Sequence, residues 1–238
     1  MKKLFAFVLL GVLASSCQED IQFNNPGFQG YRDDILFRGI DNRAYLTSGG
    51  SLNLEGLAQD EQLNITLPNA TVGTYYFGTT NQSIKAAYSS TFNGIELDYA
   101  TNLTVGPVAT IQKPLLSQGS GYTTQSGVLT SGGSGVGLLV RVTADASGLV
   151  TDVKLSSPGN NYAPGDIIIV MAGDENCTFR VQNVENSNGE VTITSNDGNT
   201  ISGKFKFNAI STNQNPLGNP VVNFQFGEFY KVPIVPQP

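Results

Sequence analysis

The sequence predicts an all-β protein, built as an antiparallel β-sandwich or barrel with a second, small β module inserted in one loop. Apolar and polar residues alternate over short segments, and turns rich in glycine or asparagine separate them at intervals of about 8–12 residues. No segment shows the apolar spacing of an amphipathic helix. Hydrophobic residues make up 39% of the chain, which is enough to build a core.

The N-terminal half predicts a series of short strands. Alternating apolar residues flank a Ser-Gly-Gly-Ser turn at 48–51, which indicates a hairpin. The segment 63–67 alternates until Pro68 ends it, and 72–77 is β-branched and aromatic. In 95–99 the apolar side chains share one face of a strand. These patterns predict strands that each bury one face.

A second hairpin is expected at 191–207, around the turn Asn196-Asp197-Gly198. Between the two hairpins, 114–184 is dense in glycine. Its segment 119–122 (Gly-Ser-Gly-Tyr) is echoed by 159–162 (Gly-Asn-Asn-Tyr), and a strand, a turn and another strand follow each copy.

The repeat predicts a domain division. We expect one β domain from 28–113 plus 185–238, with 114–184 as a module inserted in one of its loops. Long insertions in surface loops cost little stability, because the entropy of loop closure grows only logarithmically with length. The alternative is a single domain with long hairpins.

The beginning of the chain predicts export and lipidation. Residues 1–16 combine two lysines, a short apolar run and small residues, and Cys17 follows directly. The apolar run is shorter than the roughly 20 residues that span a bilayer. We expect 1–16 to be a signal peptide, Cys17 to carry a covalent lipid (palmitate or a similar acyl chain), and 17–27 to form a tether. An ordinary signal followed by a cysteine without this role is the alternative.

Composition excludes several classes of activity. The net charge is −6, and removal of the two lysines of the signal makes it −8, so the chain would repel phosphate backbones and nucleic acid is not an expected partner. The chain has no histidine, which removes the usual catalytic base and the commonest metal ligand. With Cys17 acylated, Cys177 has no disulfide partner and is expected to be a small buried apolar residue.

Two resemblances extend this interpretation. The flanks, about 21–112 and 185–238, resemble a family of small Gram-negative lipoproteins known only as a domain of unknown function. The matching residues are 23–26 (Phe-Asn-Asn-Pro), 201–209, 222–224 and 227–234. This resemblance implies a lipid anchor but supplies no activity and no catalytic residue.

The middle segment resembles a glycine-rich β repeat of phage tail and other virion-surface proteins, which implies a structural or adhesive role. The matching pieces are Gly121-Tyr122, 132–135, 148–153, Pro158-Gly159 with Tyr162, and Gly165-Asp166. Glu19 and Asp20, just after Cys17, resemble the export signal of surface-displayed lipoproteins. We therefore expect an outer-membrane lipoprotein at the cell surface, with the periplasmic face as the alternative.

The candidate ligand-binding residues are aromatic. Tyr75 and Tyr76 precede Phe77, so at least one of these rings faces outward from its strand, where it could stack on a sugar or a partner protein. Tyr122 and Tyr162 end the repeated turns and are candidates of the same kind. The alternative for each is packing at the end of its own core, with the hydroxyl bonded to a turn backbone.

The acidic candidates are fewer. Asp174 and Glu175 form an acidic turn that could contribute oxygen ligands to calcium, although the spacing of known calcium loops is absent and an ordinary turn is favoured. Glu96 and Asp98 project from one strand face, as a carboxylate hydrolase would require, but a solvated outer face is favoured. No resident cofactor and no catalytic residue is expected.

These observations predict a cell-envelope lipoprotein that is not an enzyme and that uses β-sheet surface for binding or adhesion to an unknown protein or glycan. The first alternative is a carbohydrate- or calcium-binding accessory protein of a nutrient-uptake system. The second is a hydrolase that works with carboxylates alone.

Overall fold

The computed structural model describes residues 27–79 and 83–236, and all regular secondary structure in these ranges is β-strand, which confirms the predicted class. The predicted signal 1–16 and the predicted lipidation site Cys17 lie outside the described residues. In the described ranges, no helix has the length and apolar character needed to cross a bilayer.

The first unit is an eleven-stranded sheet that folds back on itself into a flattened, nearly closed barrel. It closes because β18 pairs with both β17 and β3, and β17 pairs with β8. Its strands are β1 Gly27–Arg32, β2 Ile35–Arg38, β3 Asp41–Leu46, β4 Leu52–Ala58, β5 Glu61–Leu67, β6 Gly73–Tyr76, β7 Lys85–Phe92, β8 Ile95–Ala100, β16 Gly189–Asn196, β17 Thr200–Ser211 and β18 Val221–Pro236.

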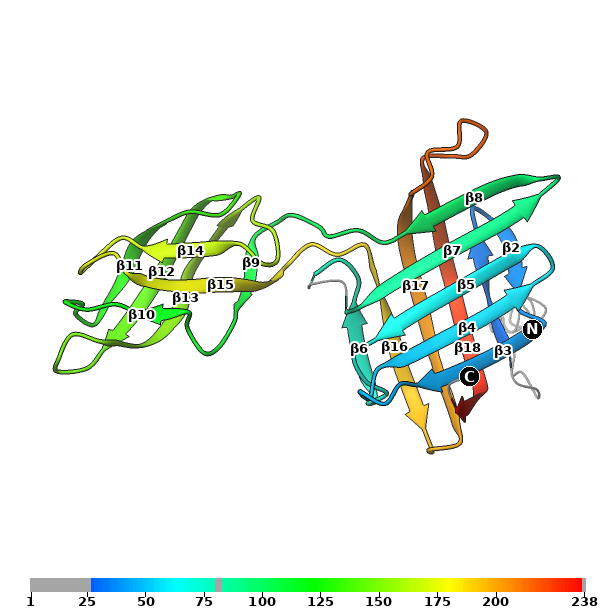
Figure 1. Cartoon of the computed structure of the whole chain (residues 1–238), viewed down its shortest axis with the longest axis horizontal. Coiled ribbons are helices and arrows are strands. Elements are labelled where there is room, and N and C mark those ends of the chain that lie inside the picture. The colour runs from blue at the N-terminus through cyan, green and yellow to red at the C-terminus, as the bar shows by residue number, and fades with distance from the viewer. Residues whose placement is uncertain (1–26, 80–82, 237–238) are drawn as a thin grey trace, which may run out of the picture.

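The barrel has two layers whose strands cross steeply. In Figure 1, β3, β4, β5, β7 and β8 run across the front, while β16, β17 and β18 pass behind them. The strands of the two layers pair over short stretches at the corners, Ile234–Pro236 of β18 with Ala44–Leu46 and Ile210–Ser211 of β17 with Tyr99–Ala100.

Both predicted hairpins are confirmed. In the β3–β4 pair, Ala44 lies opposite Leu54, and both side chains are buried. The β16–β17 pair closes at the predicted turn, where the Asp197 carboxylate accepts hydrogen bonds from the backbone N–H groups of Asn199 (2.9 Å) and Thr200 (2.7 Å).

Aromatic side chains fill the interior of the barrel. The rings of Phe207 and Phe224 stack with centroids 4.8 Å apart, and Phe205 lies within 6.3 Å of both. The remaining phenylalanines of this core are Phe28, Phe37, Phe77 and Phe229. The interior is therefore a packed core, and any ligand site must lie at its surface or its ends.

The second unit is a seven-stranded sheet with a separate hydrophobic core of mainly valine and isoleucine side chains. Figure 1 shows it beside the barrel, connected by two chain segments. Its strands are β9 Val108–Ile111, β10 Ser117–Gln118, β11 Gln125–Ser131, β12 Val136–Ala144, β13 Val150–Asn160, β14 Ile167–Val170 and β15 Cys177–Val184. Strand β9 precedes the predicted boundary at Pro114, yet it pairs with β15, and Val108 and Ile111 pack in this second core.

The repeated sequence has a repeated structure. Tyr122 precedes the strands β11 and β12, and Tyr162 precedes β14 and β15. A Cβ atom at Gly119 would lie 2.7 Å from the Tyr122 ring, and one at Gly159 would lie 2.7 Å from the Tyr162 ring. Both glycines also have positive φ, of 60° and 62°. The Gly-x-x-Tyr spacing is thus fixed by a glycine on which a tyrosine ring packs.

Candidate functional site

One end of the barrel is hollowed into a cavity of about 360 Å³. The β1–β2 turn, the strands β7 and β8 and the loop before β18 surround it. Its polar lining is Arg32, Asp33, Tyr88, Ser90, Tyr99 and Asn219, and its apolar lining is Ile35, Leu97, Leu217 and Val222. We call this cavity the barrel mouth.

Arg32 is the charged centre of the barrel mouth. It follows Phe28 and Gly30 on the inward face of β1, at the point where the strand leaves the core. Its guanidinium donates hydrogen bonds to Glu61 and to the Tyr88 hydroxyl, and it lies 5.3 Å from the centre of the Tyr88 ring. The Arg32 and Glu61 side chains are 20% and 24% exposed, so the pair is partly shielded from water but can be reached from it.

The tyrosines of the barrel mouth stay protonated at neutral pH. Burial and a 2.5 Å hydrogen bond to Glu61 raise the pKa of Tyr88 to about 12. Burial, together with the charge of Asp33, also raises the pKa of Tyr99. Both hydroxyls therefore keep their proton: that of Tyr88 donates to Glu61, and that of Tyr99 can donate to a ligand.

The rim of the barrel mouth is apolar. Ile35 is 59% exposed and Leu217 is 73% exposed, and both line the cavity. Leu217 lies in the loop 212–220, which is held against β8 by hydrogen bonds from the Asn213 and Asn215 side chains to the Glu96 carbonyl. A polar floor below an apolar rim is the usual composition of a small-molecule site.

The predicted carboxylate pair lies beside this loop. The Asp98 carboxylate accepts a hydrogen bond of 3.1 Å from the Asn213 amide, while the Glu96 side chain is exposed. Asp98 therefore has a positioning role next to the barrel mouth, and neither carboxylate is among the residues that line the cavity.

The aromatic candidates of β6 are divided between the two faces of the strand. Tyr75 packs against the barrel core and donates hydrogen bonds to the Asn69 side chain (2.6 Å) and the Thr71 carbonyl (2.8 Å). Tyr76 faces outward with 49% of its area exposed, and Phe77 is buried. Only Tyr76 of these three presents a free ring.

The ligand-binding interpretation is wrong for Tyr122 and Tyr162. Their rings are only 3% and 2% exposed, because each fills the second core beside the glycines of the repeat. The Tyr122 hydroxyl donates to the Val170 carbonyl at 3.2 Å, as the packing alternative predicts. Neither ring can stack on a ligand.

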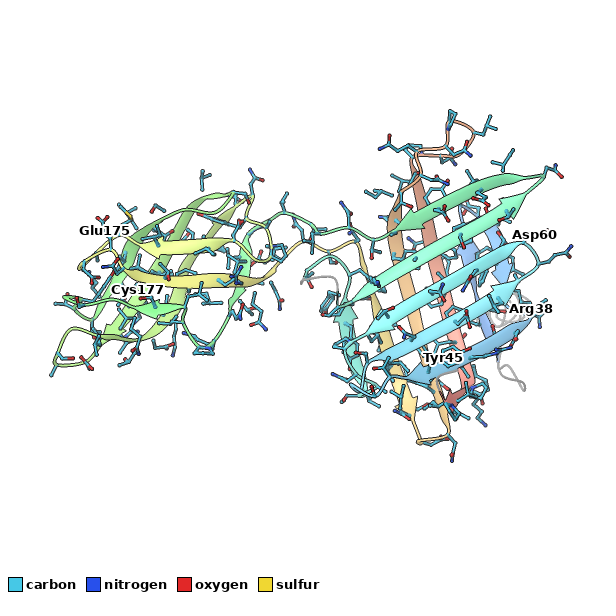
Figure 2. All side chains as sticks on the ribbon, in the orientation of Figure 1. Arg38, Tyr45, Asp60, Glu175 and Cys177 are labelled. Atoms are coloured by element: carbon cyan, nitrogen blue, oxygen red, sulfur yellow. The ribbon has the colours of Figure 1, made fainter. Side chains whose placement is uncertain are left out.

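The acidic turn of the second unit is organised by its own hydrogen bonds. Asp174 accepts from the Ser120 hydroxyl (2.8 Å) and the Asn176 backbone N–H (3.0 Å). Hydrogen bonding to the backbone of Ser120 and Asn176 holds the pKa of its carboxyl well below the usual range. Among the residues that the structure describes, no group of three acidic, cysteine or histidine side chains is placed to hold a metal ion. Figure 2 shows Glu175 and Cys177 at the end of the unit that lies far from the barrel.

Cys177 is fully buried, and burial raises the pKa of its thiol to about 11. A thiol of this kind is unreactive at neutral pH. The side chain is a small apolar part of the second core, as expected.

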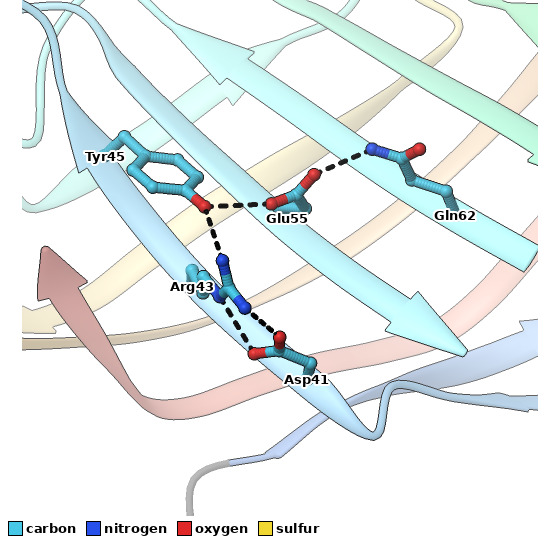
Figure 3. Close-up of polar contacts among 5 residues, drawn as sticks. All are labelled: Asp41, Arg43, Tyr45, Glu55 and Gln62. Carbon is cyan, nitrogen blue, oxygen red and sulfur yellow. Dashed lines mark hydrogen bonds and ion pairs between the residues drawn. The ribbon is translucent and has the colours of Figure 1, made fainter. Parts of the chain in front are cut away.

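A polar network covers the outer face of β3, β4 and β5 (Figure 3). The Glu55 carboxylate accepts from Tyr45 (3.1 Å) and Gln62 (2.8 Å), and Arg43 donates to Asp41 and Tyr45. The Asp41 carboxylate beside it raises the pKa of Arg43 further. This network lies on the open surface and bonds to itself, unlike Arg32, which faces a cavity.

Sequence reasoning missed the cluster of Arg32, Glu61 and Tyr88. Glu61 and Tyr88 follow Arg32 by 29 and 56 residues along the chain. Only closure of the barrel brings them together. One signal was present, because Arg32 falls on the inward face of a strand whose other inward positions are Phe28 and Gly30.

A family model described as Domain of unknown function (DUF6252) matches residues 24–126 and 157–233. The match covers both flanks and continues into the second unit. The unmatched stretch between its two parts is 127–156, which lies within β11 to β13. No curated protein and no solved structure matches the chain.

Proposed function

Because the chain belongs to the DUF6252 family, whose description names no activity, we propose from its geometry that it is a non-enzymatic lipoprotein of the cell envelope that binds a neutral, hydroxyl-rich ligand at the barrel mouth. The observation that carries this proposal is an open cavity lined by Arg32 and Tyr88, both of which bond to Glu61. This assignment makes the chain a carbohydrate-binding protein.

The charge of the cluster favours a neutral ligand. Glu61 already neutralises Arg32, and Asp33 adds a further negative charge to the lining. An anionic ligand would be repelled by these carboxylates, whereas sugar hydroxyls can accept from Arg32 and exchange hydrogen bonds with Ser90 and Asn219. A long acyl chain is disfavoured because aromatic rings fill the interior of the barrel.

The carboxylates at the barrel mouth favour binding over catalysis. Glu61 accepts from Arg32 and Tyr88, and Asp33 accepts from the Asn223 backbone N–H at 2.9 Å. A glycoside hydrolase needs one carboxylate that delivers a proton and a second that acts as nucleophile or base. Asp33 is the only carboxylate among the described residues that line the cavity, so this lining lacks the second carboxylate that hydrolysis needs.

The leader and Cys17 support the anchored part of the proposal. The described body begins at Gly27, ten residues after Cys17, and an extended tether of this length reaches about 35 Å. An acylated Cys17 would therefore keep the barrel close to the outer membrane. The acidic run after the cysteine favours display at the cell surface. Mass spectrometry of the native N-terminus tests this: an unmodified thiol, or a leader still attached, would remove the anchor.

Binding is tested by saturation-transfer NMR with a panel of neutral mono- and disaccharides. We expect a signal that is lost in Arg32→Lys, which keeps the charge but not the planar donor geometry, and in Leu217→Asp at the exposed rim. The control is Arg43→Lys on the outer face, which should bind as the unaltered chain does. A signal that both mouth variants retain, or no signal from any sugar, would contradict the proposal.

A second function, adhesion through the inserted unit, is favoured by one observation. Residues 108–184 have their own hydrophobic core, as a module that acts independently requires. The likeness of this segment to virion-surface repeats supports the same role.

A further inference from the structure

An irregularity in β18 turns an aromatic side chain out of the barrel. Gln29 of β1 lies opposite Glu228, but Tyr31 lies opposite Gln225, so β18 contains one extra residue there. The register of β18 with β17 shifts at the same place. Phe226 occupies this bulge with φ of 51°, an unfavourable conformation for a bulky residue, and its side chain is 83% exposed.

Phe226 belongs to an apolar patch at the edge of a groove. Its ring meets Tyr31 edge-on, with 6.5 Å between centroids, and Leu36 of β2 lies opposite Tyr31. Tyr31 and Leu36 are 46% and 49% exposed. Beside Phe226 a groove of about 480 Å³ runs over β16, β17 and β18, with Glu190, Lys204, Lys206 and Glu228 in its lining. This volume is ample for a phenyl ring.

The groove is electrically balanced on a chain whose net charge is −6. Lys206 forms an ion pair with Glu190 at 3.2 Å, whereas Lys204 has no carboxylate within 4.0 Å among the described side chains. Two copies of an acidic protein repel each other over most of their surface. That repulsion is weakest where charges of both signs lie beside exposed apolar side chains.

We propose that this face, made of Tyr31, Leu36, Lys204, Phe226 and Glu228, binds a second copy of the chain about a two-fold axis. A two-fold interface must be complementary to itself. Here the Phe226 ring of each copy enters the groove of the other, and each Lys204 pairs with Glu228 of the other copy. Burial of the ring offsets the strain of the bulge. An anionic bilayer would require an excess of cations, which the groove lacks.

Sedimentation equilibrium of the purified full chain in detergent micelles tests the proposal. We expect a dimer, and we expect Phe226→Asp to raise its dissociation constant about 30-fold or more, because the exposed ring is the central contact. The control is Leu129→Asp, since Leu129 is 67% exposed on β11 of the second unit and is not among the residues that line the groove. It should leave the dimer unchanged.

A charge exchange makes the test specific to the two-fold arrangement. Lys204→Glu and Glu228→Lys should each weaken the dimer, because both charge pairs between the two copies then join like charges. An equal mixture of the two variants should restore dimers that contain one copy of each variant, because both pairs then join opposite charges. A monomer at every concentration, a dimer that Phe226→Asp does not affect, or a mixture that stays monomeric would overturn the proposal. So would a monomer that binds phosphatidylglycerol vesicles through Phe226, since the face would then belong to the bilayer.

Discussion

Tyr122 and Tyr162 occupy equivalent places in the repeat, yet their hydroxyls differ. The Tyr122 hydroxyl donates to the Val170 carbonyl and accepts from the Cys177 backbone N–H at 3.1 Å, whereas the Tyr162 hydroxyl has no hydrogen bond to a described residue. The repeat predicts where the rings lie. The partners of the hydroxyl are not predictable, because they are 48 and 55 residues away.

Tyr122→Phe should therefore destabilise the second unit more than Tyr162→Phe does. Removing the Tyr122 hydroxyl leaves the buried Cys177 N–H without a partner, which costs about 1–3 kcal/mol of unfolding free energy, whereas the Val170 carbonyl still accepts from the Ala172 N–H. Tyr162→Phe keeps the ring and should change stability by less than about 0.5 kcal/mol. Urea unfolding followed by circular dichroism measures both, and equal losses would contradict the assigned role of the hydroxyl.

At the scale of elements, the strands and hairpins were predictable because their signals are local. Alternation in 63–67 gave β5, whose Leu63, Ile65 and Leu67 are all buried. Closure of the barrel was not predictable in detail, because it depends on two- and three-residue pairings between distant strands. The bulge at Phe226 was missed for a related reason, since it shows only as a shift of register against neighbouring strands.

Close packing of β17 against its neighbours gives a prediction at this scale. A Cβ atom at Gly203 would lie 2.1 Å from the Thr192 carbonyl oxygen and 2.3 Å from the Phe229 ring. Gly203→Ala should therefore lower the unfolding free energy of the barrel by about 1–3 kcal/mol, because backbone must move to make room. Gly49→Ala, whose nearest neighbour would be 3.8 Å away, is the matched control. Urea unfolding of both variants checks the difference.

The turns of the second unit depend on ionised aspartates. Burial raises the pKa of Asp166, but hydrogen bonds from the Ser134 and Ala163 backbone N–H groups outweigh it, so the pKa is lowered. The carboxyls of this unit with a lowered pKa are those of Asp145, Asp152, Asp166 and Asp174. In the described part of the barrel only Asp197 behaves in this way.

This distribution predicts that acid opens the second unit before the barrel. A lowered folded-state pKa contributes stability that is present above the unfolded value, near 3.9, and is lost as the pH falls through the folded value. Pepsin cleavage between about pH 4 and pH 2, mapped by mass spectrometry, should therefore begin within 108–184. The Asp166→Asn variant should show a smaller increase in cleavage on acidification than the unaltered chain does. First cleavage in the barrel would contradict this.

At the scale of the whole molecule, the two units are joined by a cross-bonded connection. The Asn186 amide donates to the Val105 carbonyl (2.7 Å), the Asn188 amide donates to the Asn102 carbonyl (2.5 Å), and the Thr104 hydroxyl donates to the Asn186 carbonyl (2.6 Å). These bonds tie the outgoing and returning segments to each other. The extent of the inserted domain was predictable only roughly, because glycine content marks the repeat but does not mark β9.

The connection predicts that the second unit can be removed without loss of the barrel. Replacing residues 106–185 with an Asn-Gly turn joins two segments that already lie side by side, and it leaves the aromatic core intact. The shortened chain should keep the near-ultraviolet circular dichroism of a packed aromatic core and should retain the sugar-dependent NMR signal of the barrel mouth. On cells, where protease shaving confirms that it is displayed, it should lose attachment to surfaces if the second unit is the adhesive part. Unchanged attachment would contradict adhesion through this unit, whereas loss of the aromatic signal would show that the barrel depends on the insertion.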